Sequence, residues 1–181
     1  MKRALLVIDV QLEYFTGKMP VTYPDGSMAN ILSAMDAATA AQLPVIVIQH
    51  TAPPQSPVFA KGSEGWKLHP EIERRTAMVI EKNLPGSFTG TELENILRSA
   101  GVDTVVIAGY MTQMCCDTTA RQAMHLGFKV EFLSDATGTL ALKNYAGEVD
   151  AKTLHHAVLT VQAAVFSKVM ATKDWLAEIS K

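Results

Sequence analysis

The 181-residue sequence has few cysteines, little charge and no long apolar run. Its two cysteines, Cys115 and Cys116, are adjacent, which excludes a framework of stabilising disulfides and is typical of a reducing cytoplasm. Only 19% of the residues are charged and the formal net charge is -2, so charge gives no reason to expect nucleic acid or an anionic membrane as partner. We therefore expect a cytoplasmic protein that binds a small molecule.

The apolar segments are too short for membrane insertion or export. No run approaches the roughly 20 apolar residues of a membrane span. The apolar run 4–8 follows a basic start but stops at Asp9, too early for a signal sequence. With 48% hydrophobic residues, the composition is that of a globular protein, and the length predicts a single domain over residues 1–181.

Short apolar runs alternate along the chain with segments of helical spacing, which is typical of an α/β protein. The runs that predict strands are 4–8, 45–48, 77–80, 104–108, 130–133 and 164–170. Helices are expected after Ser27, before Gly101, before Gly127, over residues 148–162 and from about Thr172. The predicted architecture has three layers, α/β/α, around a mainly parallel, six-stranded, doubly wound (Rossmann-like) sheet.

Three chemically suggestive residues follow the ends of predicted strands. Asp9 follows the first strand, Lys82 follows the third, and Cys115 lies just after the fourth. The carboxyl ends of parallel strands share one edge, so a base, a cation and a nucleophile can meet there. A cysteine at a helix N-terminus is also expected to favour the thiolate. Charged residues end strands in every α/β domain, so this pattern alone leaves catalytic and structural interpretations open.

The motifs around these residues resemble those of the isochorismatase-like cysteine hydrolases, which include nicotinamidases and N-carbamoylsarcosine amidases. The matching segments are 6–11, Lys82 with 86–88, 108–112 through Cys115 to 119–120, 123–127 and 135–136. They cover nearly the whole chain in the right order. The resemblance implies the isochorismatase-like hydrolase fold.

The resemblance also implies roles for individual residues. The nucleophile of the family follows a threonine by three positions, which selects Cys115 after Thr112. Asp9 would be the general base and acid, and Lys82 the third member of the triad. Cys116 takes a position that a small apolar residue usually holds, and we interpret it as a buried small side chain.

The family further implies an oxyanion site made by the backbone amides of Met111 and Cys115. A cis peptide would join Tyr110 to Met111. Loop 51–76 is long enough to form part of a binding site. The side chains that we predict to line a substrate pocket, with plain core packing as the alternative, are Gln11, Tyr14, Phe15, Trp66, Phe88 and Tyr110. For Gln11 the alternative is positioning the triad.

Three functions remain open from the sequence. The first is a hydrolase that cleaves a C–N bond of a small amide, ureido or carbamoyl compound through a thioester. The second is an isochorismatase, which hydrolyses a vinyl ether; such members usually lack the cysteine. The third is a binding or thiol redox-sensing module that keeps the fold without turnover. By resemblance, we expect a homodimer or homotetramer.

The sequence predicts no metal and no cofactor. Nicotinamidases of this family carry an Asp-x-His metal motif after the second strand, where this chain has Gln49, His50 and Thr51. The five histidines show no ligand spacing that is typical of a metal site. We therefore expect a chelator such as EDTA to leave activity unchanged in a steady-state assay. Activity that EDTA removes and a divalent cation restores would contradict this prediction.

Overall fold

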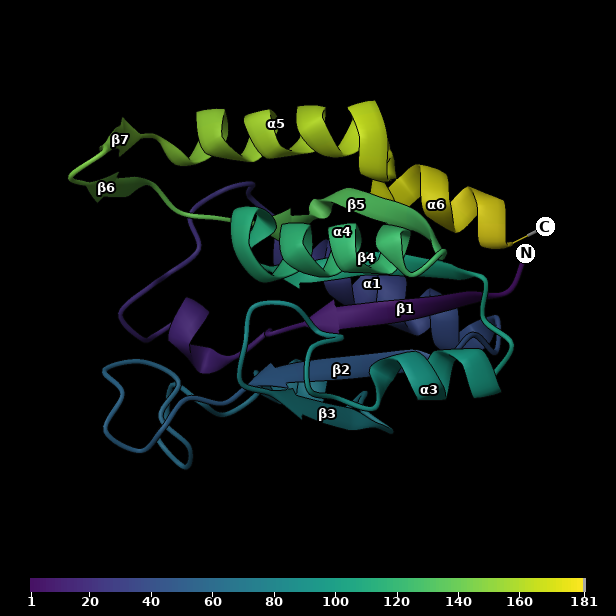
Figure 1. Cartoon of the computed structure of the whole chain (residues 1–181), viewed down its shortest axis with the longest axis horizontal. Coiled ribbons are helices and arrows are strands. Elements are labelled where there is room, and N and C mark those ends of the chain that lie inside the picture. Colours follow the sequence, from purple (N-terminus) through teal and green to yellow (C-terminus); the bar gives the residue numbers. More distant parts are fainter. Residues whose placement is uncertain (181) are drawn as a thin grey trace.

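A computed structural model describes residues 1–180, and a six-stranded parallel sheet lies at its centre (Figure 1). The strands are β1 (Arg3–Ile8), β2 (Val45–His50), β3 (Val79–Lys82), β4 (Thr104–Tyr110), β5 (Lys129–Gly138) and β8 (Lys168–Met170). Their order across the sheet is β3-β2-β1-β4-β5-β8. The chain moves outward from β1 in both directions, so the predicted six-stranded, doubly wound sheet is confirmed.

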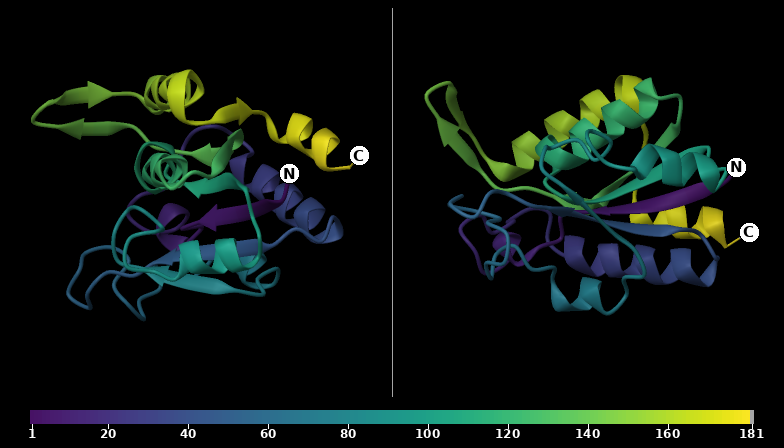
Figure 2. Two further views of the ribbon diagram at one scale, coloured as in Figure 1. Left: turned by 45° about the vertical axis from the view of Figure 1, so that its right-hand side comes forward. Right: turned by 60° about the horizontal axis from the view of Figure 1, so that its bottom comes forward.

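Helices cover both faces of this sheet (Figure 2). On one face, α1 (Ser27–Ala40) packs beside α6 (Thr172–Ile179), and the short α2 (Pro70–Glu73) buries Ile72 in the same cluster. On the other face lie α3 (Leu93–Ser99), α4 (Asp117–His125) and α5 (Ala151–Val161). The three predicted layers are therefore present.

Strand β1 shows why a continuously apolar run forms a central strand. Leu5 and Val7 belong to the apolar cluster under α1, whereas Leu6 and Ile8 belong to the cluster under α3 and α4. Successive side chains of a strand point to opposite faces, and both faces of this sheet are covered. All four side chains are fully buried. Charged residues stand only at the two ends of this run, with Arg3 at its start and Asp9 just after it.

Strand β3 begins and ends two residues later than its apolar pattern predicts. The expected strand was 77–80, but the observed one includes Glu81 and Lys82. It is an edge strand that pairs only with β2, in a register that places Lys82 opposite His50. This pairing, rather than the apolar pattern of the segment, determines its position along the chain.

The C-terminal half differs most from the sequence prediction. Residues 162–166 form a π-helical continuation of α5, η3 (Gln162–Phe166), so the strand predicted over 164–170 is wrong at its start. The apolar residues there include Val165, which is 63% exposed. A further antiparallel hairpin, β6 (Leu142–Asn144) and β7 (Gly147–Val149), was not predicted because its residues are mostly polar and exposed.

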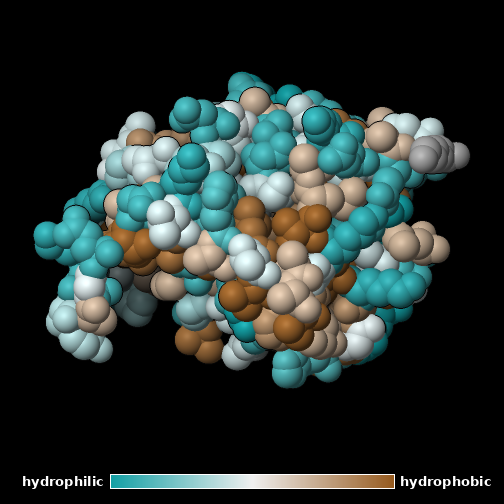
Figure 3. Space-filling model, turned by 90° about the horizontal axis from the view of Figure 1, so that it is seen from above, coloured by the Kyte–Doolittle hydropathy of each residue, from teal (hydrophilic) through white to brown (hydrophobic). Residues whose placement is uncertain are grey.

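The surface over α5 mixes hydrophilic residues with a group of hydrophobic ones near the middle of the view (Figure 3). Large apolar side chains exposed on the molecule include Tyr145 at the turn between β6 and β7, and Val161 in α5. None of the helices within residues 1–180 has the length and apolar character that crossing a bilayer requires.

Gly109 leaves no room for a side chain between β4 and β1. It pairs with Ile8, has φ 116°, and a Cβ atom there would collide with the Ile8 backbone. We expect Gly109→Ala to lower the free energy of unfolding by about 3 kcal/mol or more, because backbone cannot yield as a side-chain tip can. Urea unfolding measures this loss.

Gly26 offers a matched control for Gly109→Ala. It also has a positive φ, 78°, but nothing lies within 4 Å of an added Cβ atom. Gly26→Ala should therefore cost only about 1 kcal/mol, the conformational penalty alone. Equal losses for the two variants would show that contact with Ile8 is not the cause.

Candidate active site

Three separate elements bring Asp9, Lys82 and Cys115 together. Asp9 directly follows β1, Lys82 is the last residue of β3, and Cys115 lies in η2 (Thr112–Cys116), the π-helical turn between β4 and α4. The Lys82 Nζ atom lies 2.8 Å from Asp9 Oδ2 and 3.3 Å from Cys115 Sγ. The ammonium group therefore bridges the carboxylate and the thiol.

This cluster is almost completely buried. Asp9, Lys82 and Cys115 are 0%, 1% and 7% exposed. Within residues 1–180, Asp9 Oδ1 is the one buried side-chain nitrogen or oxygen atom that has no hydrogen-bond partner. Buried polar atoms are nearly always paired in folded proteins, so an unpaired one needs an explanation. One carboxylate oxygen is held by Lys82, and the other is free to accept a proton.

The electrostatics of the site favour a neutral thiol. Burial raises the pKa of Cys115 well above its usual range, the Asp9 charge raises it further, and Lys82 offsets only part of this. The sequence-based expectation of a thiolate at a helix N-terminus is therefore wrong. Desolvation in this buried π-helical turn outweighs the helix macrodipole. Attack by Cys115 requires a base that removes its proton.

Lys82 keeps its positive charge in the same buried cluster. Burial alone would lower the pKa of Lys82, but the charge of Asp9 and the hydrogen bonds to Asp9 and Cys115 outweigh burial and raise it. Lys82 therefore stays protonated across the physiological range and holds the site electrostatically. Its pKa is not matched to proton transfer at neutral pH.

His50 is a fourth member of the cluster that the sequence did not reveal. Its Nδ1 atom lies 3.3 Å from Lys82 Nζ, across the register of β2 and β3. Burial, together with the charge of Lys82, lowers the pKa of His50, which is therefore neutral at pH 7. The three protons of the Lys82 ammonium group thus have three acceptors. Only the strand register, which the sequence does not show, could have identified this contact.

Gln11 forms hydrogen bonds to two segments that lie next to the site. Its carboxamide donates to the carbonyls of His50 and Trp66 at 2.9 and 2.7 Å, and accepts from the backbone N–H of His50 at 2.8 Å. Gln11 is fully buried. These bonds join the end of β2 to the loop that carries Trp66, an arrangement that favours positioning over pocket lining for Gln11.

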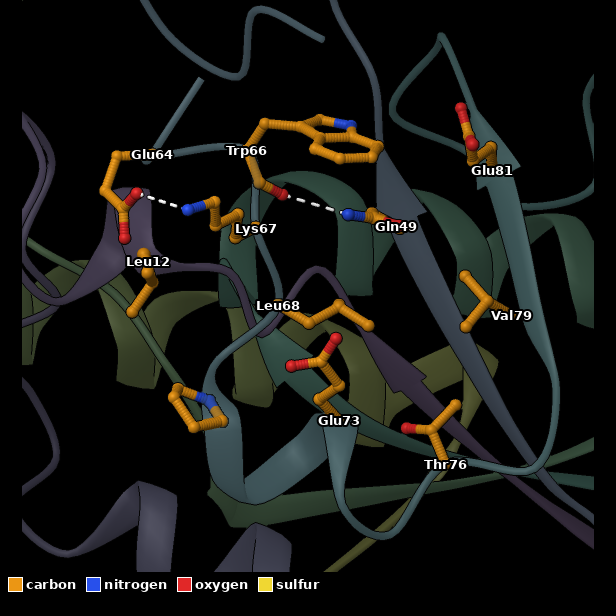
Figure 4. Close-up of a pocket in the computed structure, with 11 residues that line it drawn as sticks. Leu12, Gln49, Glu64, Trp66, Lys67, Leu68, Glu73, Thr76, Val79 and Glu81 are labelled. Atoms are coloured by element: carbon orange, nitrogen blue, oxygen red, sulfur yellow. Dashed lines mark hydrogen bonds and ion pairs between the residues drawn. The ribbon is translucent and has the colours of Figure 1, made fainter. Parts of the chain in front are cut away.

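Trp66 lies in the loop after β2, where its side chain is hydrogen-bonded to the start of the same loop. It borders a pocket of about 520 Å³ (Figure 4). Its indole Nε1 atom donates to Thr51 Oγ1 at 2.8 Å. Gln49 and Glu81, which line the same pocket, directly precede His50 and Lys82 on their strands. Neighbouring strand residues point to opposite faces, so this pocket and the Lys82 cluster lie on different sides of the sheet. The structure does not place Trp66 at the cluster.

The remaining predicted pocket residues separate into two groups. Tyr14 and Phe15 pack edge-on against Tyr110, with ring centroids 5.7 and 5.8 Å apart, and all three border a pocket of about 240 Å³. Phe88 lies elsewhere, stacked on Phe128 with centroids 6.0 Å apart. The structure therefore gathers three of the predicted aromatics and leaves Phe88 with the core beside α4.

The backbone before Cys115 has the form that the resemblance implied. The peptide bond between Tyr110 and Met111 is cis. The backbone carbonyl of Met111 accepts hydrogen bonds from the N–H groups of Met114 and Cys116. Met111 directly precedes the turn that carries Cys115, and backbone N–H groups at such a turn are suited to binding a developing negative charge.

Comparison with known proteins places this geometry in context. The sequence model of the isochorismatase domain matches residues 3–174. A crystal structure of an isochorismatase-type protein from Burkholderia xenovorans is 46% identical, covers 98% of this chain and 87% of its own, and superposes with a TM-score of 0.96. The secreted isochorismatase effector of Verticillium dahliae is 33% identical, over 94% of this chain and 88% of that protein. Nicotinamidase 3 of Arabidopsis thaliana is 32% identical, over 75% of this chain and 73% of that protein.

The raised pKa of Cys115 can be tested by titration. We expect the ultraviolet thiolate absorbance of Cys115 to be absent at neutral pH and still absent near about pH 9, above the usual thiol range. The signal is the difference between the wild type and Cys115→Ser, which cancels Cys116. Ionisation of Cys115 at or below the usual thiol pKa would contradict the burial argument.

Proposed function

The chain belongs to the isochorismatase family of hydrolases, and from this we propose that it cleaves a C–N bond of a small amide, ureido or carbamoyl compound with Cys115 as nucleophile. One observation carries the proposal. Lys82 bridges Asp9 and Cys115 within hydrogen-bond distance of both, in a buried cluster. A base, a fixed cation and a thiol in contact are the groups that acyl transfer through a thioester requires. The relative named as a nicotinamidase supports the proposal, because a nicotinamidase cleaves a C–N bond.

Acylation begins with a proton transfer. Asp9 takes the thiol proton through its free Oδ1 atom while Cys115 Sγ attacks the carbonyl carbon of the substrate. The C–N bond then breaks, and the protonated Asp9 returns the proton to the leaving amine. Lys82 keeps its own proton throughout and orients both partners. The product of this half-reaction is a thioester on Cys115.

Deacylation uses the same groups in reverse order. Asp9 takes a proton from a water molecule that attacks the thioester, and the proton returns to Cys115 Sγ as the C–S bond breaks. In both halves the carbonyl oxygen gains negative charge. We assign its stabilisation to the backbone amides of Met111 and Cys115, and the position of Met111 at the start of the Cys115 turn supports this assignment.

The aromatic cluster of Tyr14, Phe15 and Tyr110 is our proposed substrate-recognition wall. Burial raises the pKa of Tyr14 and the charge of Asp9 raises it further, so Tyr14 lies within electrostatic range of the triad. Flat aromatic surfaces suit a planar amide or ring. Assembly as a homodimer or homotetramer stays a prediction from the family resemblance.

The proposal predicts a covalent adduct at one cysteine. Incubation with a panel of small amides, ureido acids and carbamoyl amino acids, followed by mass spectrometry, should find an acyl group on Cys115. Cys115→Ala should lower turnover by about 1,000-fold or more, because removing a nucleophile disables the whole triad. Cys116→Ala is the matched control and should retain most activity, because Cys116 is fully buried.

The other outcomes of this experiment separate the alternatives. Loss of turnover in Cys116→Ala but not in Cys115→Ala would contradict the assignment. Hydrolysis of isochorismate that survives Cys115→Ala would indicate a vinyl ether hydrolase. A Cys115 that reacts with peroxide or alkylating agents but turns over no amide would indicate a redox-sensing module.

A further inference from the structure

Helix α5 and the residue that follows it contact both ends of the segment that carries Cys115. His155 of α5 reaches Thr112, the first residue of η2, and Gln162, just beyond α5, reaches Asp117, the first residue of α4. Cys115 lies between these two anchor points. His155 and Gln162 are seven residues apart, two helical turns, so they project from the same side. We call this pair the α5 clamp.

Both nitrogens of the His155 ring are engaged. Nδ1 lies 2.9 Å from Thr112 Oγ1, and Nε2 lies 2.9 Å from the carbonyl oxygen of Ser134 in β5. A carbonyl only accepts, so Nε2 carries the proton and Nδ1 accepts the hydrogen bond of the Thr112 hydroxyl. His155 is 2% exposed and Thr112 is 0% exposed. One ring therefore joins α5, β5 and the start of η2 without contact with solvent.

Gln162 holds the other end of the segment. Its Nε2 atom donates to Asp117 Oδ1 at 2.7 Å, and its Oε1 atom accepts from Ser167 Oγ at 2.6 Å. Gln162 is fully buried, and Asp117 is further fixed by Arg121 at 2.8 Å. Between the two clamp residues, Leu159 packs against the apolar cluster that includes Cys115 and Cys116.

Nothing in the triad itself fixes the backbone of η2. The turn is a single π-helical segment, and no side chain caps its start at Met111. Cys115 Sγ must nevertheless remain near Lys82 Nζ, now 3.3 Å away, and within reach of Asp9. A displacement of about 1 Å in such a site can cost about 100-fold in rate. Polar contacts at each end of the turn would prevent that displacement.

We propose that His155 is a positioning residue which, with Gln162, fixes the Cys115 turn against Asp9 and Lys82. The inference rests on the proposed role of Cys115 as nucleophile. Burial is the main cause that lowers the pKa of His155, so the neutral ring that accepts from Thr112 is the dominant form at pH 7. The two clamp residues thus lie after all three triad residues in the sequence.

The test uses p-nitrophenyl acetate, which acylates a reactive thiol and releases a coloured phenol. The size of the burst counts acylated sites, and its rate gives the acylation rate constant. We expect His155→Leu to lower that rate constant about 10- to 100-fold, with the half-saturating concentration within about twofold of wild type. His155→Asn, whose side-chain oxygen can replace Nδ1 as acceptor, should recover a rate within about fivefold of wild type.

Trp175→Phe is the control for a merely structural effect. It removes a buried hydrogen bond of the same length, 2.9 Å to Glu131, in α6 on the opposite face of the sheet. It should lower the urea unfolding midpoint much as His155→Leu does, while acylation stays within about twofold of wild type. A comparable loss of acylation in Trp175→Phe would overturn the proposal.

Variants of Thr112 provide a second, independent test of the α5 clamp. Thr112→Val should lower the acylation rate constant as His155→Leu does. Combining Thr112→Val with His155→Leu should add no further loss, whereas Thr112→Ser should retain the wild-type acylation rate. A burst that requires Cys115 but is unchanged in His155→Leu and Thr112→Val overturns the clamp alone. A burst that survives Cys115→Ala overturns the nucleophile assignment, and the clamp proposal with it.

Discussion

The buried ammonium group of Lys82 is the constraint on which the rest of the site depends. Removing a charge from water costs several kcal/mol, and that cost is offset only when every proton finds a well-placed acceptor. Asp9, Cys115 and His50 supply those acceptors, each from the end of a different strand or turn. The parallel sheet is therefore more than a scaffold, because it brings three otherwise distant chain segments within 3.3 Å of one nitrogen atom.

The same burial explains why Cys115, in the proposed role of nucleophile, needs a base. A thiol in water loses its proton near the upper end of the physiological range, but burial and the Asp9 charge hold the Cys115 proton in place. The site holds Asp9 against Lys82 with one oxygen open, and Cys115 as a neutral thiol against the same ammonium group. A low thiol pKa is thus replaced by proximity to a paired carboxylate, which keeps the resting cysteine protected from adventitious oxidants.

The central fold and the triad positions could be predicted from the sequence, because each depends on local pattern. Continuously apolar runs mark β1, β2 and β4, and the motifs after them identify Asp9 and Cys115. Contacts that depend on register or long-range packing could not be predicted. His50 meets Lys82 only through the pairing of β2 with β3, and His155 meets Thr112 across 43 residues. Residues 164–166 were misassigned because a short apolar run suits a strand and a helix equally well.

The position of β3 has a consequence for how the site is lost. Lys82 sits on a four-residue strand at the sheet edge that pairs only with β2, and Val79 in it is 43% exposed. Asp9 and the turn of Cys115 follow β1 and β4, the two central strands, each of which pairs with a neighbour on both sides. Edge segments with few partners open at lower free energy than the whole molecule. Fraying of β3 would withdraw the cation while the core stays folded, so the site is less stable than the domain that carries it.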